Sequence, residues 1–191
     1  VMTIILMLVS AMMTSISITR EKELGTMEIL LVSPLKPIQV IVGKVFPYIF
    51  LSIINAVVIV LLSIFIFKMP VQGSLFLLAM ESILFIISAL ALGILISTIS
   101  ATQQSAMMIS LMGLMLPVIL LSGFIFPISS MPLPLQIISH VIPAKWFIII
   151  LKGIMLKGVG LQFLWKETLI LLGMTVFFIA LSVKKYKIRL E

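Results

Sequence analysis

Five long apolar segments dominate this sequence, and each is long enough to cross a bilayer as a single helix. They cover residues 1–19, 40–67, 74–97, 105–126 and 163–183. A membrane-spanning helix needs about 20 mostly apolar residues, whereas the strands of a membrane barrel alternate in polarity over about 10 residues. The segments therefore predict an all-α, polytopic membrane protein with about five transmembrane helices, organised as one transmembrane domain over residues 1–191.

The composition agrees with a membrane protein and excludes several classes of site. Hydrophobic residues make up 62% of the chain and charged residues only 10%, whereas about a quarter of a soluble domain is charged. The net charge of +7 is of the kind that records orientation in the bilayer, so we expect no nucleic-acid partner. Cysteine is absent, which rules out a disulfide framework, a thiolate metal site and a cysteine nucleophile.

Basic residues indicate the orientation of the chain. They follow the first and the last apolar segment, and they are Arg20, Lys22, Lys36, Lys184, Lys185, Lys187 and Arg189. With five spans these two regions lie on the same side, and the positive-inside rule makes that side cytoplasmic. The sequence thus predicts a multi-pass protein of the plasma or inner membrane with a cytoplasmic C-terminus.

Residues 122–162 are too apolar for an ordinary loop, yet prolines interrupt them repeatedly. Irregular backbone at membrane depth is tolerated only where protein or a water-filled cavity covers it. We therefore predict a re-entrant or interfacial helical hairpin over residues 122–162 on the external face. Within the third span, Ala89, Gly93 and Ser97 are spaced by four, and this stripe of small side chains predicts the close approach of another helix.

Two polar residues inside the predicted spans, Asn55 and Glu81, are candidates for a translocation path. A carboxylate in an apolar helix marks a transport pathway, a proton relay or a buried ion pair. Alternatively, Glu81 lies about two turns from the external surface, where it would reach water or pair with Lys68. For Asn55 an interhelical hydrogen bond is favoured over contact with a substrate.

Signs of an enzyme are missing from the sequence. His140 is the only histidine, so no histidine-based metal cluster is expected, and the residues show no nucleophile with a base. The phosphate-binding pattern G-x-x-x-x-G-K-[ST] is also absent. We expect a chain that is not an enzyme and binds no metal or cofactor, so that any ATP would be hydrolysed by another subunit.

The polar segment over residues 20–37, "REKELGTMEILLVSPLKP", separates the first two spans. Gly25 should end the preceding helix, Thr26 can cap a new one, and Glu28 suits its positive N-terminal end. Leu30 and Leu31, with Met27, form an apolar face, and Pro34 ends the helix. Such an amphipathic helix is either anchored at the lipid headgroups or docks a cytosolic protein, and the physical pattern does not choose between them.

The same segment closely resembles the cytoplasmic coupling segment of the type-two ABC exporter permeases, whose pattern is roughly E-[RK]-E-x-G-T-x-E-x-L-x-x-x-P. The matching positions are Glu21, Lys22, Glu23, Gly25, Thr26, Glu28, Leu30 and Pro34. A second match, "LSGFIFPISSMP" with "IPAKWFIIILKGIML", is similar to the external re-entrant hairpin before that family's last span. The branch most resembled contains permeases for drug or small-molecule efflux.

The resemblance implies a permease subunit and its partners. Family members usually have six spans, with a large external domain after the first in this branch, so residues 1–19 correspond to the second span and the sequence to the C-terminal part. The implied partners are a cytosolic ATP-binding subunit, which would use ATP and Mg, a second permease chain in a homo- or heterodimer, and the lipid bilayer. Residues implied in coupling to the ATPase are Arg20, Glu21, Lys22, Glu23, Gly25, Thr26, Glu28, Leu30, Leu31 and Pro34.

The implied function is ATP-driven export of a small apolar molecule, drug or lipid-like substrate by alternating access. The alternative, left open by the residues themselves, is an ion- or proton-coupled secondary carrier that uses Glu81.

Overall fold

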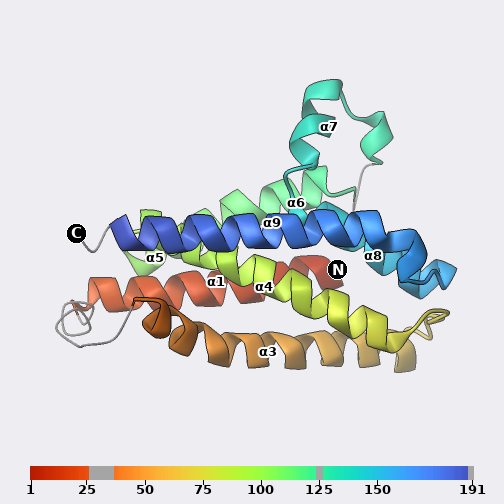
Figure 1. Cartoon of the computed structure of the whole chain (residues 1–191), viewed down its shortest axis with the longest axis horizontal. Helices are drawn as coiled ribbons and strands as arrows, with labels where there is room; N and C mark the ends of the chain where they lie inside the picture. The colour runs from red at the N-terminus through yellow and green to blue at the C-terminus, as the bar shows by residue number, and fades with distance from the viewer. Residues whose placement is uncertain (26–36, 124–126, 189–191) are drawn as a thin grey trace.

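The computed structural model describes residues 1–25, 37–123 and 127–188 (Figure 1). All regular elements in these ranges are helical, which confirms the predicted fold class. They are α1 (Met2–Glu23), α3 (Pro37–Phe65), α4 (Leu75–Ile99), α5 (Gln103–Ser110), the π-helix η1 (Leu111–Met115), α6 (Leu116–Leu121), the 3₁₀ helix η2 (Ile128–Ser130), α7 (Leu133–Ser139), α8 (Pro143–Lys157) and α9 (Leu161–Ile188).

Five of the described helices are long and apolar enough to cross a membrane, as predicted. They cover Met2–Glu23, Val42–Phe65, Leu75–Ile99, Gln103–Leu121 and Leu161–Lys185. The fourth ends before its predicted limit at residue 126, because Gly123 adopts a positive φ of 78° two residues after Leu121. A left-handed glycine just past a helix is a common way for the helix to end.

Helix α4 lies at the centre of the bundle, and it packs against α1, α9, α3 and α8. Its small-residue stripe faces α1. A Cβ atom added to Gly93 would lie 2.4 Å from the carbonyl oxygen of Ala11, and Ala89 and Ser97 are buried. The predicted close approach of another helix is therefore confirmed, and the partner is α1.

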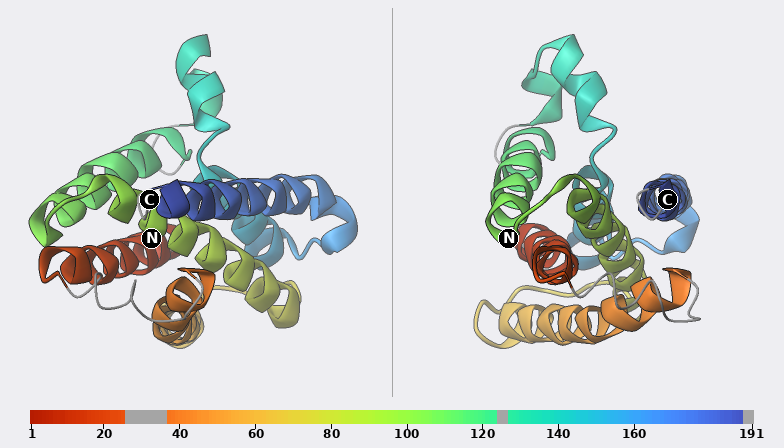
Figure 2. Two further views of the ribbon diagram at one scale, coloured as in Figure 1. Left: turned by 60° about the vertical axis from the view of Figure 1, so that its left-hand side comes forward. Right: turned by 90° about the vertical axis from the view of Figure 1, so that its left-hand side faces the viewer.

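The segment after the fourth span forms two unequal helices that meet at a bend of 79°. Helix α8 enters the bundle, where the ring of Phe147 stacks on Phe85 of α4 at a centroid distance of 4.3 Å. Helix α7 rises away from the bundle (Figure 2) and exposes Leu133 and Ile137. The two helices form a bent pair, which fits a broken span as well as a re-entrant loop, and the external re-entrant hairpin over residues 122–162 stays a prediction.

The end of α1, the start of α3, the turn between α4 and α5 and the end of α9 all lie at one end of the bundle (Figure 1). Residues 20–25 and the C-terminal part of α9 therefore share one side, as an odd number of spans requires. We call this side the α1-terminal end.

Replacing Gly93 with alanine should destabilise the bundle by about 1–3 kcal/mol, because the added methyl group meets backbone of α1 that cannot move aside cheaply. The measurement is the thermal unfolding midpoint in detergent. Gly173→Ala in α9 is the matched control, since its added Cβ would meet no atom within 4 Å and alanine favours a helix by about 1 kcal/mol. Equal midpoints for Gly93→Ala and wild type would contradict the close contact of α1 with α4.

Candidate coupling site

Three consecutive charged residues at the end of α1 contact three different helices. We call Glu21, Lys22 and Glu23 the α1 terminal cluster. Successive residues of an α-helix point about 100° apart, so neighbouring side chains reach different neighbours. The polar contacts of this cluster join α1 to α3, α4 and α5.

Glu21 forms an ion pair with Lys44 of α3. The side chains are only 30% and 17% exposed, respectively, so water screens the pair less than it would at an open surface. Because Lys44 lies two turns into α3, this contact fixes the beginning of the second span beside the end of the first.

Lys22 donates a hydrogen bond from its ammonium group to the backbone carbonyl oxygen of Ser97. Ser97 lies in the last turn of α4, which ends at Ile99. Carbonyl groups of a last helical turn lack helical partners and carry the negative end of the helix dipole, so a cation is stabilised there.

Glu23 contacts the first residue of α5. Its Oε2 atom accepts hydrogen bonds from the backbone N–H of Gln103 at 2.9 Å and from the Gln103 side-chain amide at 3.1 Å. The N–H groups of a first helical turn lack helical partners and carry the positive end of the dipole. Thr102 and Ser105 form a reciprocal capping box beside this contact.

Lys22 and Glu23 therefore bind the two sides of one helix break. Helix α4 ends at Ile99 and α5 begins at Gln103. The Lys22 cation contacts the negative C-terminal end of α4, and the Glu23 anion contacts the positive N-terminal end of α5. The charges of α1 match both helix dipoles, which fixes the break against the end of α1.

The remaining coupling residues of the sequence prediction are only partly described. Arg20 is exposed, and Gly25 ends α1 with a φ of 70°, as predicted. Thr26, Glu28, Leu30, Leu31 and Pro34 lie outside the described residues. Sequence reasoning missed Lys44, Ser97 and Gln103 as partners of the cluster, although Thr102 before Gln103 and Ser105 is a recognisable helix start.

Glu81 is buried between α4 and α9 and does not reach water. The residue is 3% exposed, and its Oε1 atom accepts a hydrogen bond from the Thr168 hydroxyl at 2.7 Å. The alternative in which Glu81 reaches water or pairs with Lys68 is not observed: Lys68 is exposed in the turn after α3, and no ion pair with Glu81 is found among the described residues. Glu81 thus joins two spans.

Among the residues that the structure describes, Asn55 does not form the predicted interhelical hydrogen bond. Its side-chain amide donates to the carbonyl of Leu51 in the same helix at 3.1 Å. The bond between α1 and α3 is made instead by two buried serines, Ser10 and Ser52, whose hydroxyl oxygens lie 2.8 Å apart. The face of α3 toward α1 carries Ser52, and Asn55 is rotated about 60° from it.

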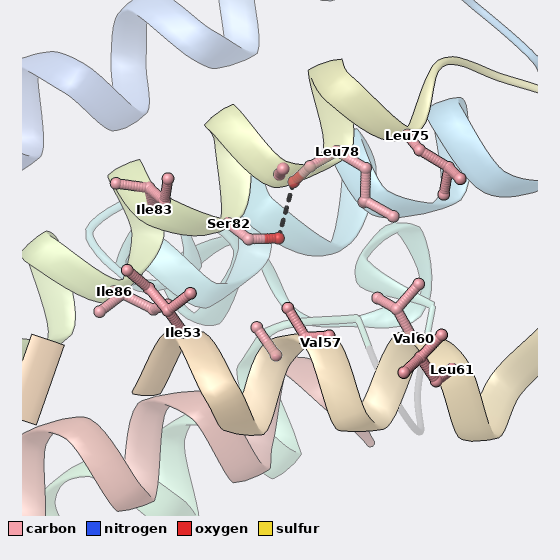
Figure 3. Close-up of a pocket in the computed structure, with 11 residues that line it drawn as sticks. Ile53, Val57, Val60, Leu61, Leu75, Leu78, Ser82, Ile83 and Ile86 are labelled. Atoms are coloured by element: carbon pink, nitrogen blue, oxygen red, sulfur yellow. Dashed lines mark hydrogen bonds between the residues drawn. The ribbon is translucent and has the colours of Figure 1, made fainter. Parts of the chain in front are cut away.

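An apolar groove lies between α3 and α4 (Figure 3), with a volume of about 200 Å³. The Ser82 hydroxyl donates to the Leu78 carbonyl at 2.7 Å, so this polar group is already satisfied within α4. Neither Asn55 nor Glu81 lines the groove, and the two residues are not brought together. The side chains labelled in Figure 3 are Ile53, Val57, Val60, Leu61, Leu75, Leu78, Ser82, Ile83 and Ile86.

The helices and the α1 terminal cluster define a polytopic helical membrane protein whose α1, α3, α4 and α5 are joined at one end of the bundle. The family model of the ABC-2 family transporter proteins matches residues 1–184. The chain therefore belongs to the ABC-2 transporter family, and the predicted resemblance is confirmed.

Relatives of the chain include two proteins of Escherichia coli K12 that are named as permeases. "Probable multidrug ABC transporter permease YbhS" is 39% identical over 189 residues, which are 99% of this chain and 50% of that protein. "Probable multidrug ABC transporter permease YbhR" is 36% identical over 162 residues, 85% of this chain and 44% of that protein. "ABC transporter G family member 20" of Dictyostelium discoideum is 27% identical over 172 residues, 89% of this chain and 23% of that protein.

The chain spans about half the length of the E. coli permeases that it matches. No solved structure matches it with significance.

Proposed function

We propose that the chain is part of the transmembrane subunit of an ATP-driven ABC exporter. The observation that carries this proposal is the α1 terminal cluster, because the segment that resembles the coupling motif starts from a helix end joined to three other helices. A force applied to residues 20–37 would act on α3, α4 and α5 together. Family membership and the names of the relatives support the same function.

The proposed partner is a cytosolic ATP-binding subunit that binds ATP and Mg and contacts the α1-terminal end. This assignment makes that end cytoplasmic, together with the C-terminus of α9. The described cations at this end include Arg20, Lys184 and Lys185, which agrees with the positive-inside rule. Two permease chains, identical or different, would complete the transporter.

We propose a small apolar molecule, a drug or a lipid-like molecule as the substrate. The multidrug names of the E. coli relatives support this class. The groove between α3 and α4 offers apolar side chains and a serine whose donor is already used. Closure of the ATP-binding subunits would move residues 20–37, and the spans would rock to open the path outward.

Charge reversal at Glu28 should weaken binding of the ATP-binding subunit at least tenfold, because the motif places this acid in the segment that meets that subunit. The measurement is the dissociation constant between the full-length permease in nanodiscs and the ATP-binding subunit. Lys157→Glu reverses an exposed charge at the end of α8, at the opposite end of the bundle, and should leave the constant unchanged. Equal affinity of Glu28→Lys and wild type would contradict the docking assignment.

A second candidate is an ion- or proton-coupled carrier, favoured by the buried carboxylate of Glu81. For the exporter we expect Glu81→Gln to keep transport within about twofold of wild type, since the amide oxygen still accepts the Thr168 hydrogen bond. Thr168→Val should instead lower the stability of the bundle by about 0.6–2 kcal/mol. The measurement is efflux of a lipophilic dye from vesicles supplied with ATP, with and without a protonophore. Loss of efflux in Glu81→Gln and in protonophore-treated wild type would favour the carrier.

A further inference from the structure

The motif that resembles the coupling segment begins with two acids and a lysine, all of which the resemblance assigns to contact with the ATPase. In the structure these side chains face the membrane domain itself. Glu21 is paired with Lys44, Lys22 with the Ser97 carbonyl, and Glu23 with Gln103.

We propose that Lys22 and Glu23 are positioning residues that fasten the α4–α5 break to the end of α1, so that α5 follows the coupling segment as one body with α1. The inference rests on the proposed function for its role in coupling, but the contact itself is independent of it. Glu23 then acts inside the permease and does not form part of the surface that recognises the ATP-binding subunit.

The contacts of Lys22 and Glu23 restrict the relative angle of α4 and α5 at the break between them. Ser100 and Thr102 both have extended backbone, with ψ angles of 136° and 156°, so no continuous helix transmits motion from α4 to α5. Without a brace across the break, the two spans can change their relative angle at these residues. The contacts of Lys22 and Glu23 supply the brace from a third helix.

The contact of Glu23 is also specific in its geometry. One carboxylate oxygen receives both the backbone and the side-chain N–H groups of Gln103, at 2.9 and 3.1 Å. Deeper in the bundle, the hydroxyl groups of Ser15 and Ser110 lie 2.9 Å apart and join the same two spans, immediately before the π-helix. Helices α1 and α5 are thus fixed at two levels, which is what rigid-body motion of the pair requires.

Gln103 offers a direct test of the contact. Its backbone amide is in the first turn of α5, where amides have no helical partner and normally exchange quickly. In the full-length permease in nanodiscs, we expect Glu23→Ala to accelerate hydrogen exchange at Gln103 at least tenfold, measured by mass spectrometry. Glu23→Gln keeps an acceptor oxygen and should preserve most of the protection. Gln104→Ala is the matched control, because Gln104 follows Gln103 in the chain and is exposed. It should leave hydrogen exchange at Gln103 unchanged.

The role in coupling is tested on the complex with the ATP-binding subunit. We expect Glu23→Ala to leave the dissociation constant of that subunit within twofold of wild type, and to reduce dye efflux per ATP hydrolysed at least tenfold. Glu23→Gln should restore most of the efflux. Gln103→Ala removes the side-chain amide but keeps the backbone N–H donor, so it should lower dye efflux per ATP hydrolysed only two- to threefold.

Three results would overturn the proposal. One is a tenfold weaker subunit affinity in Glu23→Ala with unchanged exchange at Gln103, which would make Glu23 a docking residue. Another is unchanged efflux per ATP despite faster exchange. The third is an equal loss of dye efflux per ATP hydrolysed in Glu23→Gln and Glu23→Ala. If wild-type permease binds no ATP-binding subunit, the proposed function fails, whereas the exchange experiment still decides whether Glu23 fastens α5.

Discussion

Polar contacts at the end of α1 fix the arrangement of the helices around it. Apolar helices gain little from one another in lipid, because the acyl chains they displace are equally apolar, so close packing and hydrogen bonds decide which helices associate. In this structure α1 provides both. Its terminal cluster joins α3, α4 and α5 at one end of the bundle, and Ser10 and Ser15 bond to α3 and α5 deeper inside.

The other side of the bundle is organised around α4 and α9. Thr168 of α9 bonds to Glu81, and Ser182 donates to the Ala91 carbonyl of α4 at 2.8 Å. By contrast, α3 presents many of its apolar side chains to the outside, including Phe46, Phe50 and Val57, and the groove separates part of it from α4. Helix α3 makes two polar contacts with α1, through Lys44 and Ser52, and it also packs against α4.

Local patterns in the sequence predicted the spans, the end of α1 at Gly25 and the stripe at Gly93, because each depends on neighbouring residues or on one helix face. The partners of the α1 terminal cluster escaped prediction for the opposite reason. Glu23 and Gln103 are 80 positions apart, and both are common residues for a solvated turn. Asn55 misled the prediction since its polarity suggested a partner in another helix, whereas the smaller Ser52 lies on the face that meets α1. Glu81 itself is buried and accepts a hydrogen bond from Thr168 of α9, a contact that the spacing along α4 does not reveal.

The central claim is that the end of α1 and the start of α5 move as one body. Residues 1–191 contain no cysteine, so nitroxide labels can be placed at Leu24→Cys and Ala101→Cys, two exposed sites that flank the contact, after replacement of any cysteine elsewhere in the complex. The decisive measurement is the distance distribution between these labels by electron paramagnetic resonance, in the full-length permease with its ATP-binding subunit, without nucleotide and with ATP trapped. If α1 and α5 move as one body, we expect one narrow distribution with the same mean in both states. A mean that shifts by several ångströms between the states, or a broad distribution in both, would contradict it.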